Sequence, residues 1–404
     1  MKWLFLAWLN LGRNRRRTIA TLMLTAIGVT GIMATSGFAL YTYDSLREFA
    51  MRDSGHVILT HPEFYHEQED YPLQFGLDNA QTLEQTLIRD RQVRDTLSTV
   101  EFSGLITNGN KSTIFIGEGV EPELFQVRGP SMRLDAGRLF GVSDADSGAQ
   151  ALLGKSLADN LKVSVGDGLT LMSTTVDGAL NAIDITVRGV VSTGVPAMDS
   201  RLVMTRITDA QRLLNSDRVT RIGVYLTDND QADAFYHQLT EQYPHLGVTA
   251  WHERAFFYTS VRNLYNRIFG VMGVVILAMV GFAIFNTASM SVMERTREIG
   301  ALAAMGTRNG EILRLFLIEA TLIGLLGSLV GLVLSGCLSG GLILFEVQMP
   351  PPPGQTEGYP LQVYWSVVMA MASSAIVIVL AVLASGFATF KGVRKPIVEA
   401  LDYA

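Results

Sequence analysis

Four long apolar segments constrain this chain more than any other feature of its sequence. Residues 18–43, 268–290 and 364–390 contain no Asp, Glu, Lys or Arg, and residues 315–345 contain only one such residue, Glu319. A helix needs about 20 predominantly apolar residues to cross the hydrocarbon core of a bilayer, and each segment meets that length. We therefore expect four transmembrane helices.

The composition indicates that these helices share the chain with a soluble domain. Of the 404 residues, 48% are hydrophobic, which is too many for an ordinary soluble protein and too few for one that lies wholly in the membrane. Residues 44–262 have the composition of a soluble α/β domain. Alternating apolar residues predict strands, for example over 100–106, helical spacing predicts a helix over 78–97, and 151–171 read as a helix followed by a turn and a strand. The predicted fold class is therefore a membrane protein, α-helical with four transmembrane helices, plus a large extracytoplasmic α/β domain inserted between the first and second spans.

Basic clusters set the expected orientation. Arginines at 15–17 precede the first span, and Lys and Arg residues at 391–395 follow the fourth, so the positive-inside rule places both ends in the cytoplasm. A basic start before an apolar run could also mark a secretory signal peptide, but the run at 18–43 exceeds the roughly 7–15 residues of a signal core. A retained span is therefore favoured. The single cysteine, Cys337, leaves no intrachain disulfide, so the α/β domain must be stabilised by its own core.

The spans and their flanks define the predicted domain boundaries. In chain order these are an interfacial amphipathic helix at 1–17, the first span at 18–43, the α/β domain with its stalk at 44–262, the second span at 263–290, a cytoplasmic segment at 291–314, the third span at 315–345, a short extracytoplasmic loop at 346–363, the fourth span at 364–390 and a cytoplasmic tail at 391–404. The part at 44–262 is ample for one or two compact cores.

The segment between the second and third spans is short and charged. It begins Glu294-Arg295-Thr296-Arg297-Glu298-Ile299-Gly300 and runs on to Met305-Gly306. Glu294 lies one helical turn from Glu298 and three residues before Arg297, so the segment can form a helix with paired charges. Such a helix at the membrane surface could receive a push from a soluble partner. Ion pairs of this kind are common and weak, so they are not strong evidence for a functional helix. The alternative is a loop that merely connects two spans.

The third span carries glycines at a spacing that lets helices pack closely. The glycines occur in two pairs, Gly327 with Gly331 and Gly336 with Gly340. A Gly-rich membrane helix without a specific partner is the alternative. The same span contains Glu319, and an intramembrane acid is a functional candidate. Glu319 could instead snorkel to the surface or pair with Arg314 or Arg295.

Motifs for other chemistry are incomplete. Gly154-Lys155-Ser156 resembles the end of a phosphate-binding loop, but that pattern requires a glycine where Ala149 stands. His56, His61 and His66 lack the spacing of a compact metal site. No basic patch with interleaved aromatic residues lies outside the apolar segments, which argues against nucleic-acid binding. We expect no enzyme activity, cofactor or metal in this chain.

Several motifs resemble one family. The run from Glu294 to Gly300, then Met305-Gly306 and residues 312–320, resembles the coupling region of the MacB/FtsX/LolC-type permeases, the membrane subunits of one class of ABC transporter. Residues 153–158, and 187–194 with Asp199, resemble the extracytoplasmic domain of that family. The resemblance implies that the charged segment fits a groove on a cytoplasmic ABC ATPase, and that ATP and Mg²⁺ bind to that partner.

The expected function is transport that is powered by ATP hydrolysis in a separate subunit. We expect a permease subunit that couples ATP hydrolysis by a separate ATPase to movement of the α/β domain, in a multi-pass protein of the bacterial inner membrane. Sparsely polar spans make a poor aqueous channel, so the expected substrate is amphiphilic or already periplasmic: a lipoprotein or lipid, a peptide or a drug. Expected partners are the ATPase subunits, a second permease copy or paralogue, membrane lipids and, as a further candidate, a periplasmic adaptor or lipoprotein carrier. The alternatives are an FtsX-like regulator that activates a periplasmic cell-wall hydrolase, and a membrane-anchored sensor without an ATPase.

Overall fold

A computed structural model shows two compact units within one chain. It describes residues 2–13, 15–65, 69, 71–128, 132–141, 148–254, 256–349 and 358–393. The helical unit comprises Met1–Asp44, Arg262–Val347 and Pro360–Ala404, and the α/β unit comprises Ser45–Val261 and Gln348–Tyr359. Each unit has its own core.

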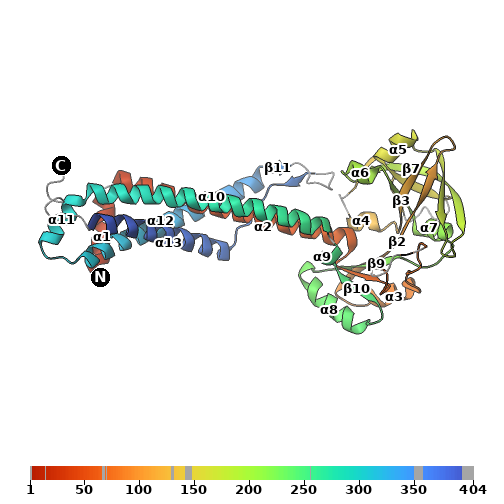
Figure 1. Cartoon of the computed structure of the whole chain (residues 1–404), viewed down its shortest axis with the longest axis horizontal. Coiled ribbons are helices and arrows are strands. Elements are labelled where there is room, and N and C mark those ends of the chain that lie inside the picture. The colour runs from red at the N-terminus through yellow and green to blue at the C-terminus, as the bar shows by residue number, and fades with distance from the viewer. Residues whose placement is uncertain are drawn as a thin grey trace. The chain divides into compact units, whose positions relative to one another are not determined.

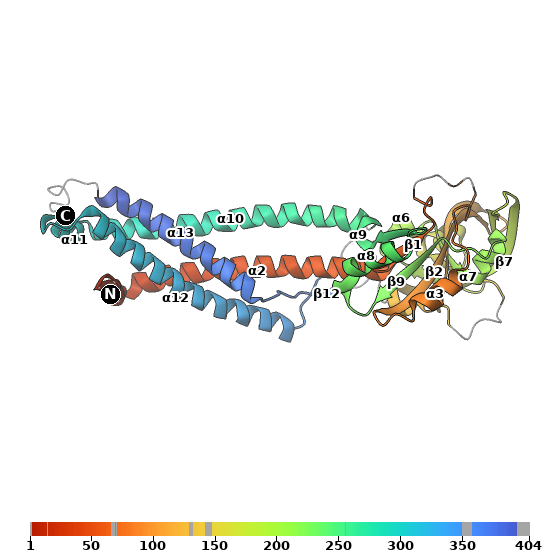
Figure 2. The same ribbon diagram turned by 90° about the horizontal axis from the view of Figure 1, so that it is seen from below.

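Four long and two short helices contribute to the helical unit in the described part of the chain (Figures 1 and 2). They are α1 (Lys2–Arg13), α2 (Arg15–Ser54), α10 (Phe256–Glu294), α11 (Thr296–Ala304), α12 (Asn309–Leu344) and α13 (Val367–Val393). In the described part of the chain, four helices are long and apolar enough to cross a membrane: Thr18–Ser54, Tyr258–Glu294, Asn309–Leu344 and Val367–Lys391. This agrees with the four spans expected from the sequence.

Two of these helices are longer than a bilayer requires. The helix α2 has 40 residues, and at 1.5 Å per residue it extends for about 60 Å. The hydrocarbon core of a bilayer is only about 30 Å thick. The helix α10 has 39 residues and is nearly as long. Each of the two helices therefore continues past the apolar segment that predicted it, which ends at Tyr43 in α2 and begins at Ile268 in α10.

The helical unit has an apolar core where its helices meet. One cluster of buried side chains, from α2, α10 and α13, consists of Val29, Met33, Ile284, Ala370, Val377 and Ala381. A second cluster, nearer to α11, consists of Val292, Ile299, Ile312, Phe316 and Ala388. Near the start of α13, the N–H of Tyr364 donates to the carbonyl oxygen of Gly37 in α2 at 3.2 Å.

A mixed sheet forms the α/β unit, in the order β10-β1-β9-β2-β3-β8-β5-β7-β4, with β6 paired to β2 and β7. The strands are β1 (Val57–Thr60), β2 (Val93–Thr107), β3 (Ser112–Val120), β4 (Arg133–Gly137), β5 (Gln150–Gly154), β6 (Gly168–Thr174), β7 (Leu180–Ser192), β8 (Leu202–Arg206), β9 (Arg221–Leu226) and β10 (Gly247–Ala250). The accompanying helices are α3 (Ala80–Leu87), α4 (Leu124–Arg128), α5 (Lys155–Leu161), α6 (Pro196–Asp199), α7 (Ile207–Leu214), α8 (Ala232–Gln242) and α9 (Trp251–Arg254). Two short strands, β11 (Gln348–Met349) and β12 (Tyr359–Pro360), pair with each other.

Two predicted helices of this unit are wrong in part. The helix predicted over 78–97 ends at Leu87, and β2 begins at Val93. Val93 and Leu97 lie four residues apart, a spacing that fits one face of a helix and also one face of a strand. The predicted helix at 151–171 begins with β5, because Ala151, Leu152 and Leu153 are a short apolar run buried within the sheet.

The two segments that resemble the family's extracytoplasmic domain meet at Asp199. This buried carboxylate accepts hydrogen bonds from Ser192 Oγ at 2.8 Å and from the N–H and Oγ1 of Thr193 at 2.9 and 2.8 Å. A Cβ atom on Gly154 would lie 2.2 Å from the carbonyl oxygen of Asp199. The glycine of Gly154-Lys155-Ser156 is therefore required for packing, and Lys155 Nζ lies 3.2 Å from Asp135.

Candidate functional site

The charged segment between the second and third spans folds as a separate helix, α11. The helix α10 ends at Glu294 and α11 begins at Thr296, whose Oγ1 donates to the carbonyl oxygen of Met293 at 2.8 Å. After α11, Gly306 has a φ of +87°, a conformation that glycine adopts without the steric cost of a side chain. The N–H of Arg308 donates to Glu311 at 3.3 Å where α12 begins. The segment is thus a short helix held between two long ones.

One face of α11 is exposed and the other is buried. Arg297, Glu298 and Met305 are exposed, and Met305 has 75% of its surface free. Ile299 is buried in the apolar cluster that includes Ile312 and Phe316 of α12. The predicted coupling residues therefore divide into an outward group of Glu294, Arg297, Glu298, Met305 and Gly306 and an inward group of Arg295, Ile299 and Gly300.

Arg295 and Glu319 form a buried ion pair. Arg295 Nη1 donates to Glu319 Oε1 at 2.8 Å and to Oε2 at 3.1 Å, and each side chain is only 8% exposed. Of the alternatives that the sequence left open, the structure selects Arg295 over Arg314. Removing one partner of such a pair leaves a buried charge and costs about 3–5 kcal/mol.

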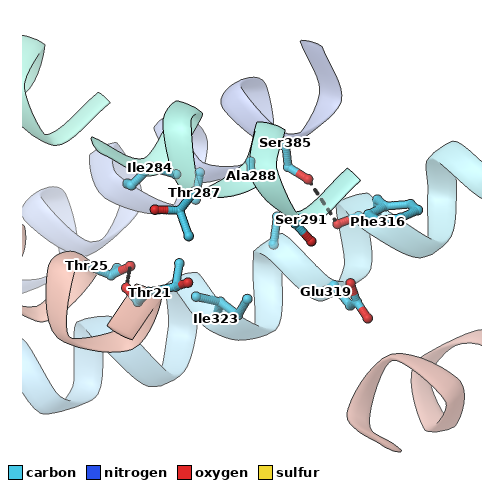
Figure 3. A pocket seen from close by; sticks show the side chains of 12 residues that line it. Thr21, Thr25, Ile284, Thr287, Ala288, Ser291, Phe316, Glu319, Ile323 and Ser385 are labelled. Carbon is cyan, nitrogen blue, oxygen red and sulfur yellow. Dashed lines mark hydrogen bonds between the residues drawn. The ribbon is translucent and has the colours of Figure 1, made fainter. Parts of the chain in front are cut away.

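A small cavity lies beside Glu319 (Figure 3). Its volume is about 40 Å³, room for a few water molecules at about 10–15 Å³ each. Side chains from α2, α10, α12 and α13 line it, and those that carry oxygen are Thr21, Thr25, Thr287, Ser291, Glu319 and Ser385. Thr25 Oγ1 donates to the carbonyl oxygen of Thr21 at 2.7 Å, and Ser385 Oγ to that of Phe316 at 3.4 Å. The cavity is too small to hold a drug-sized molecule.

The two glycine pairs of the third span have different surroundings. A Cβ atom on Gly327 would lie 2.6 Å from Thr25 Cβ, and one on Gly331 would lie 2.7 Å from the carbonyl oxygen of Ala26, so both pack against α2. A Cβ atom on Gly336 or on Gly340 would meet nothing within 4 Å. Of the two pairs, the first therefore packs closely against a neighbouring helix, and the second meets no described part of the chain.

The histidines weighed as metal ligands serve other purposes where the structure describes them. His56 is buried, its Nε2 lies 2.8 Å from Asn229 Oδ1, and its Nδ1 accepts the N–H of Leu226 at 3.3 Å. Burial lowers the pKa of His56. The ring of His61 stacks on Phe75, and His66 lies outside the described residues. Among the described residues, no group of three or more His, Cys, Asp or Glu side chains could hold a metal ion.

Two partly buried carboxyl groups in the α/β unit, those of Glu84 and Glu121, were not predicted from the sequence. Glu84 of α3 accepts a hydrogen bond from Ser98 Oγ at 2.6 Å. Burial, together with the nearby charges of Glu84 and Glu123, raises the pKa of Glu121 to about 7. Burial also raises the pKa of Glu84. Only the fold brings α3 to the end of β3, so no local pattern in the sequence could have revealed the pair.

Comparison with known families agrees with this arrangement. The family model of the MacB-like periplasmic core domain matches residues 18–242, and that of the FtsX-like permease C-terminal region matches residues 270–397. The chain therefore belongs to the ABC transporter permeases that combine these two regions. This confirms the family indicated by the motifs at 153–199 and 294–320.

Three curated relatives share between 25% and 29% sequence identity with this chain. The lipoprotein-releasing system transmembrane protein LolC of Xylella fastidiosa (strain Temecula1) is 29% identical over 201 residues, which cover 48% of this chain and 47% of LolC. The probable syringafactin export ATP-binding/permease protein SyfD of Pseudomonas syringae pv. tomato is 25% identical over 365 residues, 85% of this chain and 52% of SyfD. The macrolide export ATP-binding/permease protein MacB of Salmonella typhi is 25% identical over 380 residues, 89% of this chain and 55% of MacB. The chain spans about half the length of the curated relatives it matches.

Proposed function

We propose that this chain is a permease subunit that transmits movement rather than forming a channel. In this proposal a separate cytoplasmic ABC ATPase binds at α11, and ATP hydrolysis moves that helix. The long helices α10 and α2 carry the movement to the α/β unit, which acts on an amphiphilic substrate. The observation that carries the proposal is α11 itself, a short helix with one charged, exposed face between two helices of bilayer-spanning length.

The two faces of α11 suit this role. Arg297 and Glu298 lie on the exposed face, where charged groups can form specific contacts with a partner protein. Ile299 anchors the opposite face in the apolar cluster. A force applied to the exposed face would therefore reach the helical unit through packed side chains instead of being lost in a flexible loop.

The lengths of α2 and α10 support transmission as well. Both helices continue without a break well past their apolar segments. A continuous helix has all its internal backbone hydrogen bonds formed, so it moves as a unit more readily than a hinged one.

The nature of the spans supports an amphiphilic substrate. They contain few charged residues. Of two cavities among the described parts of these helices, one has a volume of about 40 Å³, and the other, of about 440 Å³, is lined mainly by apolar side chains of α2 and α10. A hydrated polar molecule would find no aqueous path there, whereas a molecule with an apolar part can stay in the lipid. The name of the relative LolC refers to lipoprotein release, and a lipoprotein belongs to this class of substrate.

A second permease copy or paralogue is part of the proposal. In the apolar stretch of α10 only 6% of the residues are buried within the chain, against 33% in α2 and in α12. The stretch is therefore available to lipid or to another permease. We place the complex in the bacterial inner membrane, and a periplasmic adaptor or lipoprotein carrier remains a further proposed partner of the α/β unit.

The experiment is ATP hydrolysis by the complex reconstituted in lipid with the ATPase that co-purifies with the chain. Glu298→Lys should lower the permease-dependent ATPase rate at least several-fold, because it reverses a charge on the exposed face of α11. Glu241→Lys, the same charge reversal at an exposed position of α8, serves as the control and should leave the rate unchanged. Normal assembly and a normal rate in Glu298→Lys would contradict the proposal.

A further inference from the structure

We propose that the Arg295–Glu319 ion pair transmits movement of α11 to α12. The contact of Gly327 and Gly331 with α2, called the glycine seam below, then transmits this movement from α12 to α2. The inference rests on the proposed function and adds a second path to it. The first path leads from α11 directly into α10. The second reaches α2 by way of two contacts that lie within the helical unit.

Arg295 joins the two helices on either side of it. The residue lies between the last residue of α10 and the first residue of α11. Its carbonyl oxygen accepts a hydrogen bond from the N–H of Ile299 in α11 at 2.9 Å. Its guanidinium donates two hydrogen bonds to Glu319 of α12. A tilt of α11 must therefore move the backbone that carries this guanidinium.

The ion pair is suited to remain closed during such a movement. Both side chains are buried, and Arg295 Nε has no hydrogen-bond partner among the described residues. Separating the two charges would leave each one buried without its partner, which is costly. Displacing Arg295 should therefore pull Glu319 with it instead of breaking the pair.

The buried face of α12 leads from Glu319 to the seam. It continues through Ala320 and Gly324 to Gly327 and Gly331. At Gly331 a Cβ atom would lie 2.7 Å from the carbonyl oxygen of Ala26 and 2.8 Å from Val29 Cβ.

A direct hydrogen bond reinforces this seam. Thr30 Oγ1 of α2 donates to the carbonyl oxygen of Gly331 at 3.1 Å. A side chain of α2 is thus bound directly to the backbone of α12 at the glycine where the two helices approach closely.

The cavity beside Glu319 supplies room for the movement. Glu319 lines it together with Thr21 of α2 and Ser291 of α10. Closely packed interiors resist displacement, so a small cavity where four helices meet allows α10 and α12 to shift without compressing their neighbours. The ion pair, the glycine seam and the cavity therefore lie along one continuous path from α11 to α2.

The first experiment tests the ion pair in the full-length chain, without any ATPase. In a Cys337→Ser background, Ile299→Cys reports whether α11 is docked, through its rate of reaction with N-ethylmaleimide in detergent. Glu319→Gln should raise that rate at least tenfold, and the exchanged pair Arg295→Glu with Glu319→Arg should bring it back toward the original value. Glu241→Gln makes the same chemical change at an exposed position of α8 and should have no effect. An unchanged rate in Glu319→Gln would overturn the inference whatever the ATPase does.

The second experiment tests the seam in the assembled complex. Gly331→Leu should leave the labelling rate at position 299 unchanged and lower the permease-dependent ATPase rate several-fold. Gly336→Leu is the same substitution on the same helix at a position with open space, and it should lower neither. Equal behaviour of the two leucine variants would overturn transmission through the seam. If Glu298→Lys also left the ATPase rate unchanged, the proposed function itself would fail, so the two failures can be told apart.

Discussion

At the scale of single residues, Glu121 makes the stability of the α/β unit depend on pH. Its pKa is about 7 in the folded protein and 4.5 for an ordinary glutamate, so the folded state binds the proton more tightly than the unfolded state. This contribution to stability is present in full below pH 4.5 and is lost as the pH rises to 7. Glu121→Gln mimics the protonated group and should be more stable than the original protein at pH 8, by about 1–3 kcal/mol.

The measurement is thermal unfolding of the full-length chain in detergent at pH 8 and pH 4.5. The gain should vanish at the lower pH, where both proteins carry a neutral group at position 121. Glu241→Gln, on an exposed position of α8, should change neither value. A gain of the same size at both pH values would show that burial of the charge is not its cause.

His56 should act with the opposite sign. Burial lowers its pKa from 6.5, so as the pH falls below 6.5 the unfolded chain takes up a proton that the folded chain resists. Stability is therefore present above pH 6.5 and declines on acidification. His56→Gln should lower stability at pH 7.5 by about 1–2 kcal/mol, because the bonds to Asn229 and Leu226 are disturbed. It should also lose less stability than the original protein between pH 7.5 and 5.5.

Thermal unfolding at these two pH values checks this prediction, with the exposed His252→Gln as the control. Between pH 4.5 and 6.5 the contributions of Glu121 and His56 to stability change in opposite directions. A His56→Gln variant with the same acid-induced loss as the original protein would contradict the assignment.

At the scale of elements, the turn from α11 to α12 depends on a single glycine. Gly306 has a φ of +87°, whereas Gly310 lies in the first turn of α12, and a Cβ atom would meet nothing within 4 Å at either position. Gly306→Ala should therefore destabilise the turn by about 1 kcal/mol. Gly310→Ala should stabilise α12 by up to about 1 kcal/mol. Thermal unfolding should show shifts of opposite sign, and equal shifts would show that backbone conformation is not the cause.

The elements that could be predicted from the sequence are those whose evidence is local. Long runs of uncharged residues predicted the four spans, since a bilayer-length apolar segment has few other solutions. The helix predicted over 78–97 was wrong beyond Leu87, because a four-residue spacing cannot distinguish a helix face from a strand face. A stalk was expected at the start of residues 44–262, but the sequence did not predict where α2 ends, which is at Ser54.

The contacts of the candidate site were less predictable, because they depend on which helices pack together. Glu319 had two arginines within reach by sequence, and only the packing of α11 on α12 selects Arg295. The two glycine pairs of α12 have the same spacing, yet only Gly327 and Gly331 meet α2. Nothing in the local sequence separates one pair from the other.

At the scale of the whole molecule, the proposed function requires α11 and the α/β unit to lie on opposite sides of the membrane. Met305 is 75% exposed after α11, and Leu180 is 77% exposed at the start of β7. In a Cys337→Ser background, Met305→Cys and Leu180→Cys place one thiol at each location. A membrane-impermeant maleimide applied to spheroplasts should label the cysteine at 180 and leave that at 305 unlabelled until the membrane is made permeable. Inverted membrane vesicles should show the reverse pattern and serve as the control. Labelling of position 305 in intact spheroplasts would place α11 beyond the reach of a cytoplasmic ATPase, and transmission through Arg295 and Glu319 would then have no source.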